Sequence, residues 1–463
     1  MAFMETLLSL IFLLSSSLLL HSVAVHESPE SITLSLIHPF SIHSPFYPGK
    51  NVTDVEKINL LIKATEAHMQ HLFPTTTMRR QGSQNGSSEI DDIGALVGFN
   101  GAYYLAIVGI GSFPPVPGPK FKTYSLVMDT GSVMTWVQCE GCDPCLPLLQ
   151  PNFPYRRSQS YSSIPCGHKD CPTPERDCHG QSCGFKVRYG DINRGPITRG
   201  TIVRETLAFT SDISRGAIVS YSNSFLGCGL HSSNYGFPTQ STVAGILGLG
   251  PGGYGTKPIW KQVAKKRFSY CLFISEHASS KLYIGGERMV GPQVVSTPLV
   301  GGSNPTLYYV DLHDISIAGI RLGLQRSALS GGCAIDTGAP MTSLVANIYA
   351  LVRASFVRYF AQYGIQPYGS RGRPSNLPDL DLCFPKPPSF NRFPTMTFHF
   401  READLVVQPT GIFSMGTNYI CVTIKPATET LIGAHQQTQH RFFIDFELGN
   451  RVFFAPENCG ATT

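Results

Sequence analysis

The sequence predicts a mainly β protein with few short helices, built from two similar halves. From about residue 96 onward, short apolar and aromatic runs alternate with Gly, Pro and Asn, as in strands joined by turns. The triplet Asp-Thr-Gly occurs twice, at 129–131 and 336–338, and each copy follows an apolar run. Each half also carries a later apolar run that contains glycine, at 244–250 and 430–437. These repeats predict an all-β fold with a dyad organisation.

The strand patterns are spread over both halves. They lie at 103–111, 124–131, 184–191, 281–286, 308–320, 396–400 and 441–456. The clearest helical pattern in this part of the chain lies at 346–364. Strand patterns therefore outnumber helical ones, as expected of an all-β protein.

The first 24 residues predict a signal peptide. An apolar run at 6–20 is too short to span a bilayer, and small residues offer a cleavage site after Ala24. A buried N-terminal helix is the alternative. No later run suits a membrane helix, and the polar C-terminal sequence does not suit a lipid anchor. We therefore expect a secreted protein with no stable membrane anchor.

Residues 25–95 differ in character from the rest of the chain. The segment 56–72 has the best amphipathic helical pattern of the sequence, and a polar stretch rich in Gly and Ser follows it. This pattern predicts a helical segment on a tether that can be cut. Two Asn-X-Ser/Thr sequons, at Asn51 and Asn85, predict exposed glycosylation sites in the same region.

The charge and cysteine content narrow the partners and the compartment. The formal net charge is +5, and Lys and Arg are scattered without a basic block, which argues against a nucleic acid partner. Thirteen cysteines indicate an oxidising compartment. The cluster at 139–145 could bind zinc, but behind a signal peptide disulfides are favoured. Because thirteen is odd, at least one thiol is left over.

The two triplets predict chemistry by paired carboxylates. One copy alone is commonly a turn at a strand end. If the two halves face each other, Asp129 and Asp336 meet, and two carboxylates in contact cannot both ionise. The charged member can take a proton from a water between them, while the protonated member donates a hydrogen bond to a substrate carbonyl. This reaction cleaves an amide and needs no metal or other cofactor.

The other residues of the triplets are expected to support the carboxylates. Thr130 and Thr337 brace the two loops across the dyad, because each can bond to the opposite loop. Gly131 and Gly338 allow tight backbone turns.

The residue after each triplet differs between the halves. Ser132 can donate a hydrogen bond to Asp129, whereas Ala339 has no hydroxyl to offer to Asp336. Loss of that bond disfavours the ionised carboxylate, so the pKa values of the pair should be higher than with Ser or Thr at both positions. We expect an enzyme that works at milder acidity than one with two hydroxyls.

Over nearly its whole length the sequence resembles the pepsin-like aspartic proteases, specifically the plant nepenthesin-type branch. The matching segments are LSLIHPFSIHSPFYP at 34–48, DTGSVMTWVQC at 129–139, FSYCL at 268–272, DLCF at 381–384 and QQTQHRFFIDFELGNRVFFAPENC at 436–459. The resemblance implies a bilobal pepsin-like fold with pseudo-twofold symmetry and a central cleft. It implies a signal peptide at 1–24, a propeptide and linker at 25–95, an N-terminal lobe at 96–295 and a C-terminal lobe at 300–463.

The resemblance also assigns roles to residues. Asp129 and Asp336 become the catalytic pair, and Trp136 supplies the indole N–H that binds a flap tyrosine. The flap residues are Tyr189, Gly190 and Asp191. The glycines of the two later apolar runs, Gly248 and Gly433, pass beneath the catalytic loops.

Six disulfides are implied by the same resemblance. The expected pairs are Cys139–Cys142, Cys145–Cys228, Cys166–Cys183, Cys171–Cys178, Cys271–Cys459 and Cys383–Cys421. Cys333, three residues before Asp336, is left over as a buried thiol.

The flap departs from the family pattern. YGDINRGPITRG at 189–200 contains a three-residue insertion, with Pro196 in place of a serine and with Arg194 and Arg199 nearby. A longer flap can change which substrate side chains the cleft accepts.

Two functions follow for the whole chain. The first is a secreted, monomeric zymogen of an aspartic endopeptidase that hydrolyses extended polypeptides at acidic pH, outside the cell or in the vacuole. The alternative is a catalytically weak or inactive protein of the same fold that binds and inhibits cell-wall-degrading enzymes. The two intact triplets and Tyr189 favour the enzyme.

Overall fold

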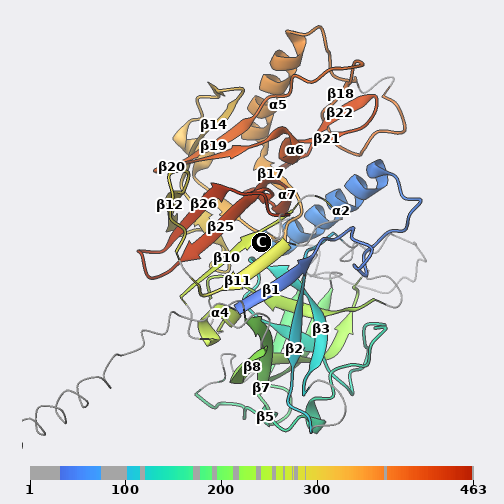
Figure 1. Ribbon diagram of the computed structural model, residues 1–463, viewed down its shortest axis with the longest axis vertical. Coiled ribbons are helices and arrows are strands. Elements are labelled where there is room, and N and C mark those ends of the chain that lie inside the picture. Colours follow the sequence, from blue (N-terminus) through green and yellow to red (C-terminus); the bar gives the residue numbers. More distant parts are fainter. Residues whose placement is uncertain are drawn as a thin grey trace, which may run out of the picture.

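The protein is described here by a computed structural model. It covers residues 32–73, 102–114, 120–169, 171, 178–189, 196–211, 218–235, 241–252, 257–263, 266–273, 275, 280–286, 288–369 and 373–460. In these ranges most of the regular structure is β strand. The all-β prediction is therefore confirmed. Figure 1 shows two β-rich halves, one below and one above, with an N-terminal strand and helix between them.

Nineteen of the described strands form one large sheet. They are β1 (Ile32–Ile37), β2 (Leu105–Ile110), β3 (Lys122–Asp129), β4 (Trp136–Gln138), β5 (Ser162–Ser163), β6 (Gly184–Arg188), β7 (Ile197–Ser211), β8 (Ile218–Ser233), β9 (Val243–Gly248), β10 (Arg267–Cys271), β11 (Ser280–Ile284), β12 (Val295–Val300), β13 (Tyr308–Val310), β16 (Cys333–Ile335), β17 (Thr342–Val345), β23 (Ile424–Ala427), β24 (Thr430–Ile432), β25 (His440–Asp445) and β26 (Arg451–Pro456).

Two smaller sheets belong to the C-terminal half. One contains β15 (Ile320–Arg321), β14 (Leu312–Ile317), β19 (Met396–Phe400) and β20 (Ala403–Val407), and the other β18 (Cys383–Pro385), β22 (Tyr419–Val422) and β21 (Phe413–Met415). The helices are α2 (Asp54–Leu72), α4 (Ile259–Gln262), α5 (Ala346–Ala361), α6 (Pro409–Ile412) and α7 (Ala434–Gln437), with 3-10 turns η3 (Tyr155–Arg157) and η5 (Arg326–Leu329).

The predicted segments overlap the observed elements, with shifted ends. The run 308–320 is broken into β13 and β14, and its end turns at Ala318 and Gly319, which both have positive φ angles. The helix expected at 56–72 begins at Asp54, because Thr53 caps it. The Thr53 side chain accepts from the Glu56 N–H and the Glu56 carboxylate accepts from the Thr53 N–H, which satisfies two N–H groups of the first turn.

The two halves repeat one strand arrangement around the triplets. β3 ends at Asp129 and pairs in parallel with β9, while β16 ends directly before Asp336 and pairs in parallel with β24. After the first triplet, β4 pairs in parallel with β8 and antiparallel with β9. After the second, β17 pairs in parallel with β23 and antiparallel with β24. This repetition is the structural basis of the pseudo-twofold symmetry.

Gly248 and Gly433, the glycines of the two later apolar runs, lie against the backbone that follows each triplet. Gly248 is the register partner of Asp129, and a Cβ atom there would lie 2.7 Å from the backbone of Val133. A Cβ atom at Gly433 would overlap the backbone of Met341 in the same way. Only glycine allows the two backbones to approach so closely.

The N-terminal segment, residues 32–73, is part of the folded body. β1 pairs antiparallel with β11 over Ile32–Leu36 and also with β2 and β7. The buried face of α2 contacts both halves. Leu61, Ile62 and Ala64 belong to one apolar cluster with Trp136 and Tyr189, and Met69 and Leu72 to another with Ala339 and Leu431. Figure 1 shows α2 crossing between the halves.

Four of the six expected disulfide pairs are wrong. The pairs are Cys139–Cys228, Cys142–Cys145, Cys166–Cys178, Cys171–Cys183, Cys271–Cys459 and Cys383–Cys421. The expected pairs Cys139–Cys142, Cys145–Cys228, Cys166–Cys183 and Cys171–Cys178 are therefore corrected. The expected pairs Cys271–Cys459 and Cys383–Cys421 agree with the structure.

Strand register explains these corrections. Val137 is the register partner of Cys228, and the N–H of Cys139 bonds to the carbonyl of Gly229, so Cys139 lies beside Cys228. With Cys139 paired to Cys228, Cys142 and Cys145 form a disulfide with each other. The other four cysteines of this region lie between residues 166 and 183. The backbone N–H of Cys166 donates to the carbonyl of Gln181, and the N–H of Cys183 donates to the carbonyl of Ile164. Cys166 and Cys183 are therefore offset by two residues and do not lie opposite each other.

Cys333 is the free cysteine of the described residues. It lies on β16, buried, and burial raises the pKa of its thiol. Of the helices that the structure describes, none has the length and apolar character needed to cross a membrane.

Candidate active site

Asp129 and Asp336 lie together at the centre of the molecule. Their exposed fractions are 1% and 0%. Each Oδ1 atom accepts a hydrogen bond from the backbone N–H two residues later, Gly131 for Asp129 and Gly338 for Asp336, at 2.8 Å in both cases. The two triplet loops therefore hold their carboxylates in the same way.

The threonines link the two loops. The N–H of Thr130 donates to Oγ1 of Thr337 at 3.1 Å, and the N–H of Thr337 donates to Oγ1 of Thr130 at 2.9 Å. Oγ1 of Thr130 also donates to Oδ1 of Asp336 at 3.2 Å. These reciprocal bonds fix the two carboxylates relative to each other.

The glycines make room for the carboxylate of the opposite loop. A Cβ atom on Gly131 would lie 2.5 Å from Oδ2 of Asp336, and one on Gly338 would overlap Oδ1 of Asp129. Real Cβ atoms do not approach other atoms so closely, so glycine is required at both positions.

The two carboxylates differ in the donor to Oδ2. The hydroxyl of Ser132 donates to Oδ2 of Asp129. Ala339 has no donor, and Oδ2 of Asp336 is instead contacted by Nε2 of His68 at 2.6 Å. His68 comes from α2, and its side chain is 1% exposed.

Sequence reasoning missed His68. The sequence contained a usable signal, because positions 61, 65, 68 and 72 follow the spacing of one helix face. This face carries two polar residues, Thr65 and His68, among leucines. A histidine on the apolar face of a helix predicted to cover a carboxylate pair is a candidate partner of that pair.

The N-terminal segment determines how the carboxylates titrate. Burial lowers the pKa of His68, but the charge of Asp336, the hydrogen bond to it and the charge of Asp129 outweigh burial and raise it. Burial raises the pKa of Asp336, yet the charge and hydrogen bond of His68 outweigh that effect and lower it. The stable form is an imidazolium paired with an ionised Asp336.

Asp129 behaves in the opposite way. Burial and the charge of Asp336 raise its pKa to about 6, although the charge of His68 and the bond from Ser132 oppose the rise. Asp129 is therefore the member of the pair that holds a proton below this pH.

Tyr189 lies beside Ser132, the residue that follows the first triplet. Its buried hydroxyl accepts a hydrogen bond from Nε1 of Trp136 at 3.0 Å and also interacts with the hydroxyl of Ser132. Tyr235, which the sequence reasoning missed, packs its ring against both aromatic rings at centroid distances of 6.0 and 6.2 Å. The predicted flap residues Gly190 and Asp191, and Arg194, lie outside the described residues.

Polar contacts hold α2 in place over the site. The N–H of Met341, three residues after the second triplet, donates to Oγ1 of Thr65 at 3.0 Å. The N–H of Asp379 donates to Oδ1 of Asn59 at 2.8 Å. Further contacts join Asn304 to Leu72 and Lys425 to Glu66. A peptide therefore cannot reach the carboxylates while α2 occupies this position.

Three residues of the site have ligand atoms that could hold a metal ion. The ligand atoms of His68, Asp129 and Asp336 lie within 4.8 Å of one another. The contact between His68 and Asp336, 2.6 Å, is a hydrogen-bond distance, whereas two ligands about 2.0 Å from a zinc ion lie about 3.3 Å apart. The observed geometry is that of an ion pair.

A shared proton and two fixed carboxylates can activate a water for attack on an amide. A bilobal β fold with such a pair defines a pepsin-like aspartic protease. Two family models, described as xylanase inhibitor N-terminal and C-terminal, match residues 116–286 and 307–456.

Known proteases give a closer assignment. The chain is 30% identical to aspartic proteinase nepenthesin-1 of Nepenthes gracilis over 89% of each sequence. It is 28% identical to a probable aspartic protease of Arabidopsis thaliana, covering 96% of this chain and 97% of that protein. The chain belongs to the plant pepsin-like aspartic protease family, in its nepenthesin-type branch, and is an aspartic endopeptidase whose substrates are polypeptides.

Solved structures agree on the fold. The crystal structure of edgp has a TM-score of 0.61 at 19% identity and covers 78% of this chain and 92% of its own. The crystal structure of basic 7S globulin from soybean has a TM-score of 0.60 at 18% identity. The match covers 78% of this chain and 95% of that protein. At these identities the likeness concerns the fold alone.

Proposed function

We propose that this chain is the zymogen of a secreted, monomeric aspartic endopeptidase that hydrolyses extended polypeptides at acidic pH. In this proposal residues 1–24 are a signal peptide and residues 25–95 a prosegment and linker. The lobes of the mature enzyme are residues 96–295 and 300–463. The observation that supports the proposal is the ion pair between His68 and Asp336 at 2.6 Å, which joins the N-terminal segment to one of the two proposed catalytic carboxylates.

Removal of the prosegment changes which aspartate is charged. The charge and hydrogen bond of His68 are the largest effects that lower the pKa of Asp336, ahead of the hydrogen bonds from Gly338 and Thr130, so the departure of His68 favours the protonated form of Asp336. The bond from Ser132 remains and favours the charged form of Asp129. Asp129 then takes a proton from the water between the carboxylates, and Asp336 donates its proton to the substrate carbonyl as the water attacks.

The flap tyrosine and the cysteines fit this assignment. Tyr189 is held by Trp136 above Asp129, where it can cover a bound peptide. Six disulfides suit an extracellular or vacuolar destination. Of the two proposed glycosylation sites, Asn51 is exposed at the turn before α2, and Asn85 lies outside the described residues.

Proteolysis by the full chain tests the proposal. The oxidised protein is incubated with a denatured protein substrate between pH 3 and pH 7, with and without pepstatin. Cleavage is expected at acidic pH after the prosegment is lost, and Asp129→Asn or Asp336→Asn should lower the rate by at least roughly a thousandfold. The control is Asp381→Asn, an exposed residue paired with Arg353.

The alternative is a binding protein that inhibits cell-wall-degrading enzymes. The description of the matching family models as xylanase inhibitor supports its inclusion in the test. If the acid-treated protein cleaves nothing but inhibits a xylanase stoichiometrically, and Asp129→Asn inhibits equally well, the alternative holds. Proteolysis that survives substitution of either aspartate would contradict the proposed mechanism.

A further inference from the structure

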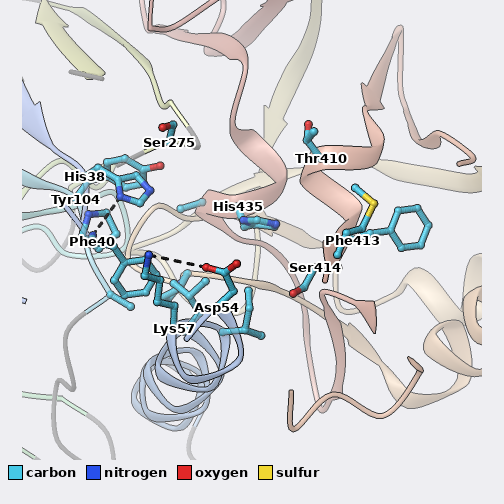
Figure 2. A pocket seen from close by; sticks show the side chains of 17 residues that line it. His38, Phe40, Asp54, Lys57, Tyr104, Ser275, Thr410, Phe413, Ser414 and His435 are labelled. Atoms are coloured by element: carbon cyan, nitrogen blue, oxygen red, sulfur yellow. Dashed lines mark hydrogen bonds and ion pairs between the residues drawn. The ribbon is translucent and has the colours of Figure 1, made fainter. Parts of the chain in front are cut away.

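A cavity of about 410 Å³ lies between the N-terminal segment and the C-terminal half. One wall comes from the loop after β1 and from α2, with His38, Asp54 and Lys57 as its titratable members. The other wall comes from Tyr104, Pro340, the α6–β21 segment and α7. Figure 2 shows Asp54 extending from α2 toward the side of the cavity on which His435 lies, while the amine of Lys57 lies on the side of Phe40.

The second wall is tied directly to the catalytic loop. The N–H of Ala434 donates to the carbonyl of Ala339 at 2.8 Å, and the N–H of His435 donates to the carbonyl of Pro340 at 2.9 Å. Ala339 and Pro340 directly follow the second Asp-Thr-Gly triplet. A peptide bound across Asp129 and Asp336 must therefore pass this cavity once the N-terminal segment has left.

His435 is the unusual residue of this wall. Its Nε2 atom is buried and has no hydrogen-bond partner among the described residues. Burial disfavours the charged imidazole and lowers the pKa of His435 to about 4. The function described above makes no use of this imidazole.

We propose that this cavity is a substrate subsite of the mature enzyme that binds a carboxylate side chain, and that His435 determines this preference. The proposal rests on the proposed function, because a peptide can enter only after the N-terminal segment leaves. The class of ligand follows from the charges of the two walls.

The two charged residues of the lining, Asp54 and Lys57, leave together with the N-terminal segment. Asp54 and Lys57 lie on α2 and pair with each other at 3.9 Å. The wall that stays contains His435 and the hydroxyls of Tyr104, Ser275, Thr410 and Ser414, but no acidic residue among its described members. In the zymogen Asp54 already places a carboxylate in the lining of this cavity. The unpartnered Nε2 atom of His435 and the hydroxyl donors suit the same group on a substrate.

Opening of the cavity also makes the imidazole a better cation. Once α2 has left, water reaches the cavity and the burial that disfavours the charged form decreases. Below its ordinary pKa of about 6.5 the imidazole is then charged, and a glutamate is charged above about 4.3. The pair forms between these values. Removal of the prosegment takes away Lys57, Asp54 and His38. Among the described lining residues, Tyr104 is then the titratable group that remains beside His435.

Paired peptides test the subsite. The full chain is activated at acidic pH, and kcat/KM is measured for peptides that carry Glu or its isostere Gln at each successive position around the cut. At pH 5 a preference for Glu of about tenfold is expected at a single position, since a charged hydrogen bond is roughly twice as strong as a neutral one. His435→Leu should abolish that preference, and His435→Lys should retain it above pH 7, where the wild-type preference fades. His313→Leu is the matched control, because His313 is exposed on β14.

The outcomes separate the subsite from the protease function. If Gln peptides are cleaved but Glu and Gln are treated alike at every position, the subsite proposal is wrong and the protease function stands. If nothing is cleaved, affinities of the same peptides for the acid-treated Asp129→Asn protein provide the readout. A preference for Glu that His435→Leu removes supports the subsite, and equal affinities overturn it.

Discussion

Nε2 of His68 lies 2.6 Å from Oδ2 of Asp336, and both side chains are buried. On the other carboxylate the corresponding oxygen, Oδ2 of Asp129, accepts from Ser132. The N-terminal segment thus provides the donor that the second triplet lacks. The segment provides this donor only while it blocks the site. When the segment leaves, Asp336 loses the donor and Ala339 has no hydroxyl to replace it.

Loss of this ion pair should release the prosegment. His68→Leu removes the cation and leaves a buried Asp336 without its partner, and breaking a buried pair in this way costs about 3–5 kcal/mol. We expect the variant zymogen to bind pepstatin at pH 6, where the wild-type zymogen does not, and to be cut by trace protease at least tenfold faster. Titration calorimetry measures the binding of pepstatin, and gel assays measure the rate of cutting.

The control for this variant is another histidine of the same segment. His43 is exposed on the turn before α2, and His43→Leu should leave inhibitor binding and the rate of cutting unchanged. If His68→Leu also matches the wild type in both assays, the ion pair does not hold the segment.

The release of the segment should have two pH limits. The pKa of His68 is raised, so its contribution is complete below the ordinary value of about 6.5 and is lost as pH rises through the raised value. The pKa of Asp336 is lowered, so its contribution is complete above 3.8 and is lost as pH falls through the lowered value. The segment is held most firmly between these two ordinary values.

His68→Lys separates the two limits. The lysine pKa of about 10.4 should extend the upper limit to higher pH while leaving the lower limit, set by Asp336, in place. The rate of conversion from pH 2 to pH 9, followed on gels in Asp129→Asn mixed with active enzyme, measures both limits. A lower limit that moves with the residue at position 68 would show that Asp336 does not set it.

A hydroxyl at position 339 should change the mature enzyme and the zymogen together. Ala339 is fully buried and packs with Met69 and Leu72 of α2. In Ala339→Ser the hydroxyl can donate to Oδ2 of Asp336, which favours the ionised form and competes with His68 for the same oxygen.

Two measurements check this substitution. The alkaline limb of the pH–rate profile should move down by about half a unit to one unit, because Asp336 must be protonated to donate to the substrate carbonyl. The prosegment should also leave at a higher pH than in the wild type. Ala328→Ser, at a partly buried position of η5, serves as the control. An alkaline limb that stays in place would mean that the hydroxyl does not reach the carboxylate.

The repeated features of the chain could be predicted from sequence because they are local. Asp-Thr-Gly after an apolar run predicts a strand that ends in a tight loop, and the structure has β3 and β16 in these places. The glycine of each later apolar run predicts close approach of two backbones, which Gly248 shows against Val133.

Long-range register could not be predicted in this way. The bridge between Cys139 and Cys228 depends on how β4 lies beside β8, 89 residues apart in sequence, and a slip of a few residues would favour another partner. The contact between His68 and Asp336 spans 268 residues. Amphipathic spacing places His68 on the buried face of α2, but only the docking of α2 shows which carboxylate it meets.

The hydrogen bond between Trp136 and Tyr189 leads to the last prediction. The hydroxyl of Tyr189 accepts from Nε1 of Trp136 at 3.0 Å and interacts with Ser132, which in turn donates to Asp129. Tyr189→Phe leaves a buried indole N–H without an acceptor, which costs about 1–3 kcal/mol. It also removes a group that orients the donor to Asp129.

We therefore expect Tyr189→Phe to lower kcat/KM by about tenfold to a hundredfold, with part of the loss in kcat because the orientation of Ser132 changes. Double-mutant cycles with Trp136→Phe measure the coupling, which should reach about 1 kcal/mol since the pair shares one bond. Tyr363→Phe, a partly exposed tyrosine after α5 in the C-terminal half, is the control. Additive effects of the two substitutions, with a change in KM alone, would mean that the tyrosine only contacts substrate and does not act through Ser132 on Asp129.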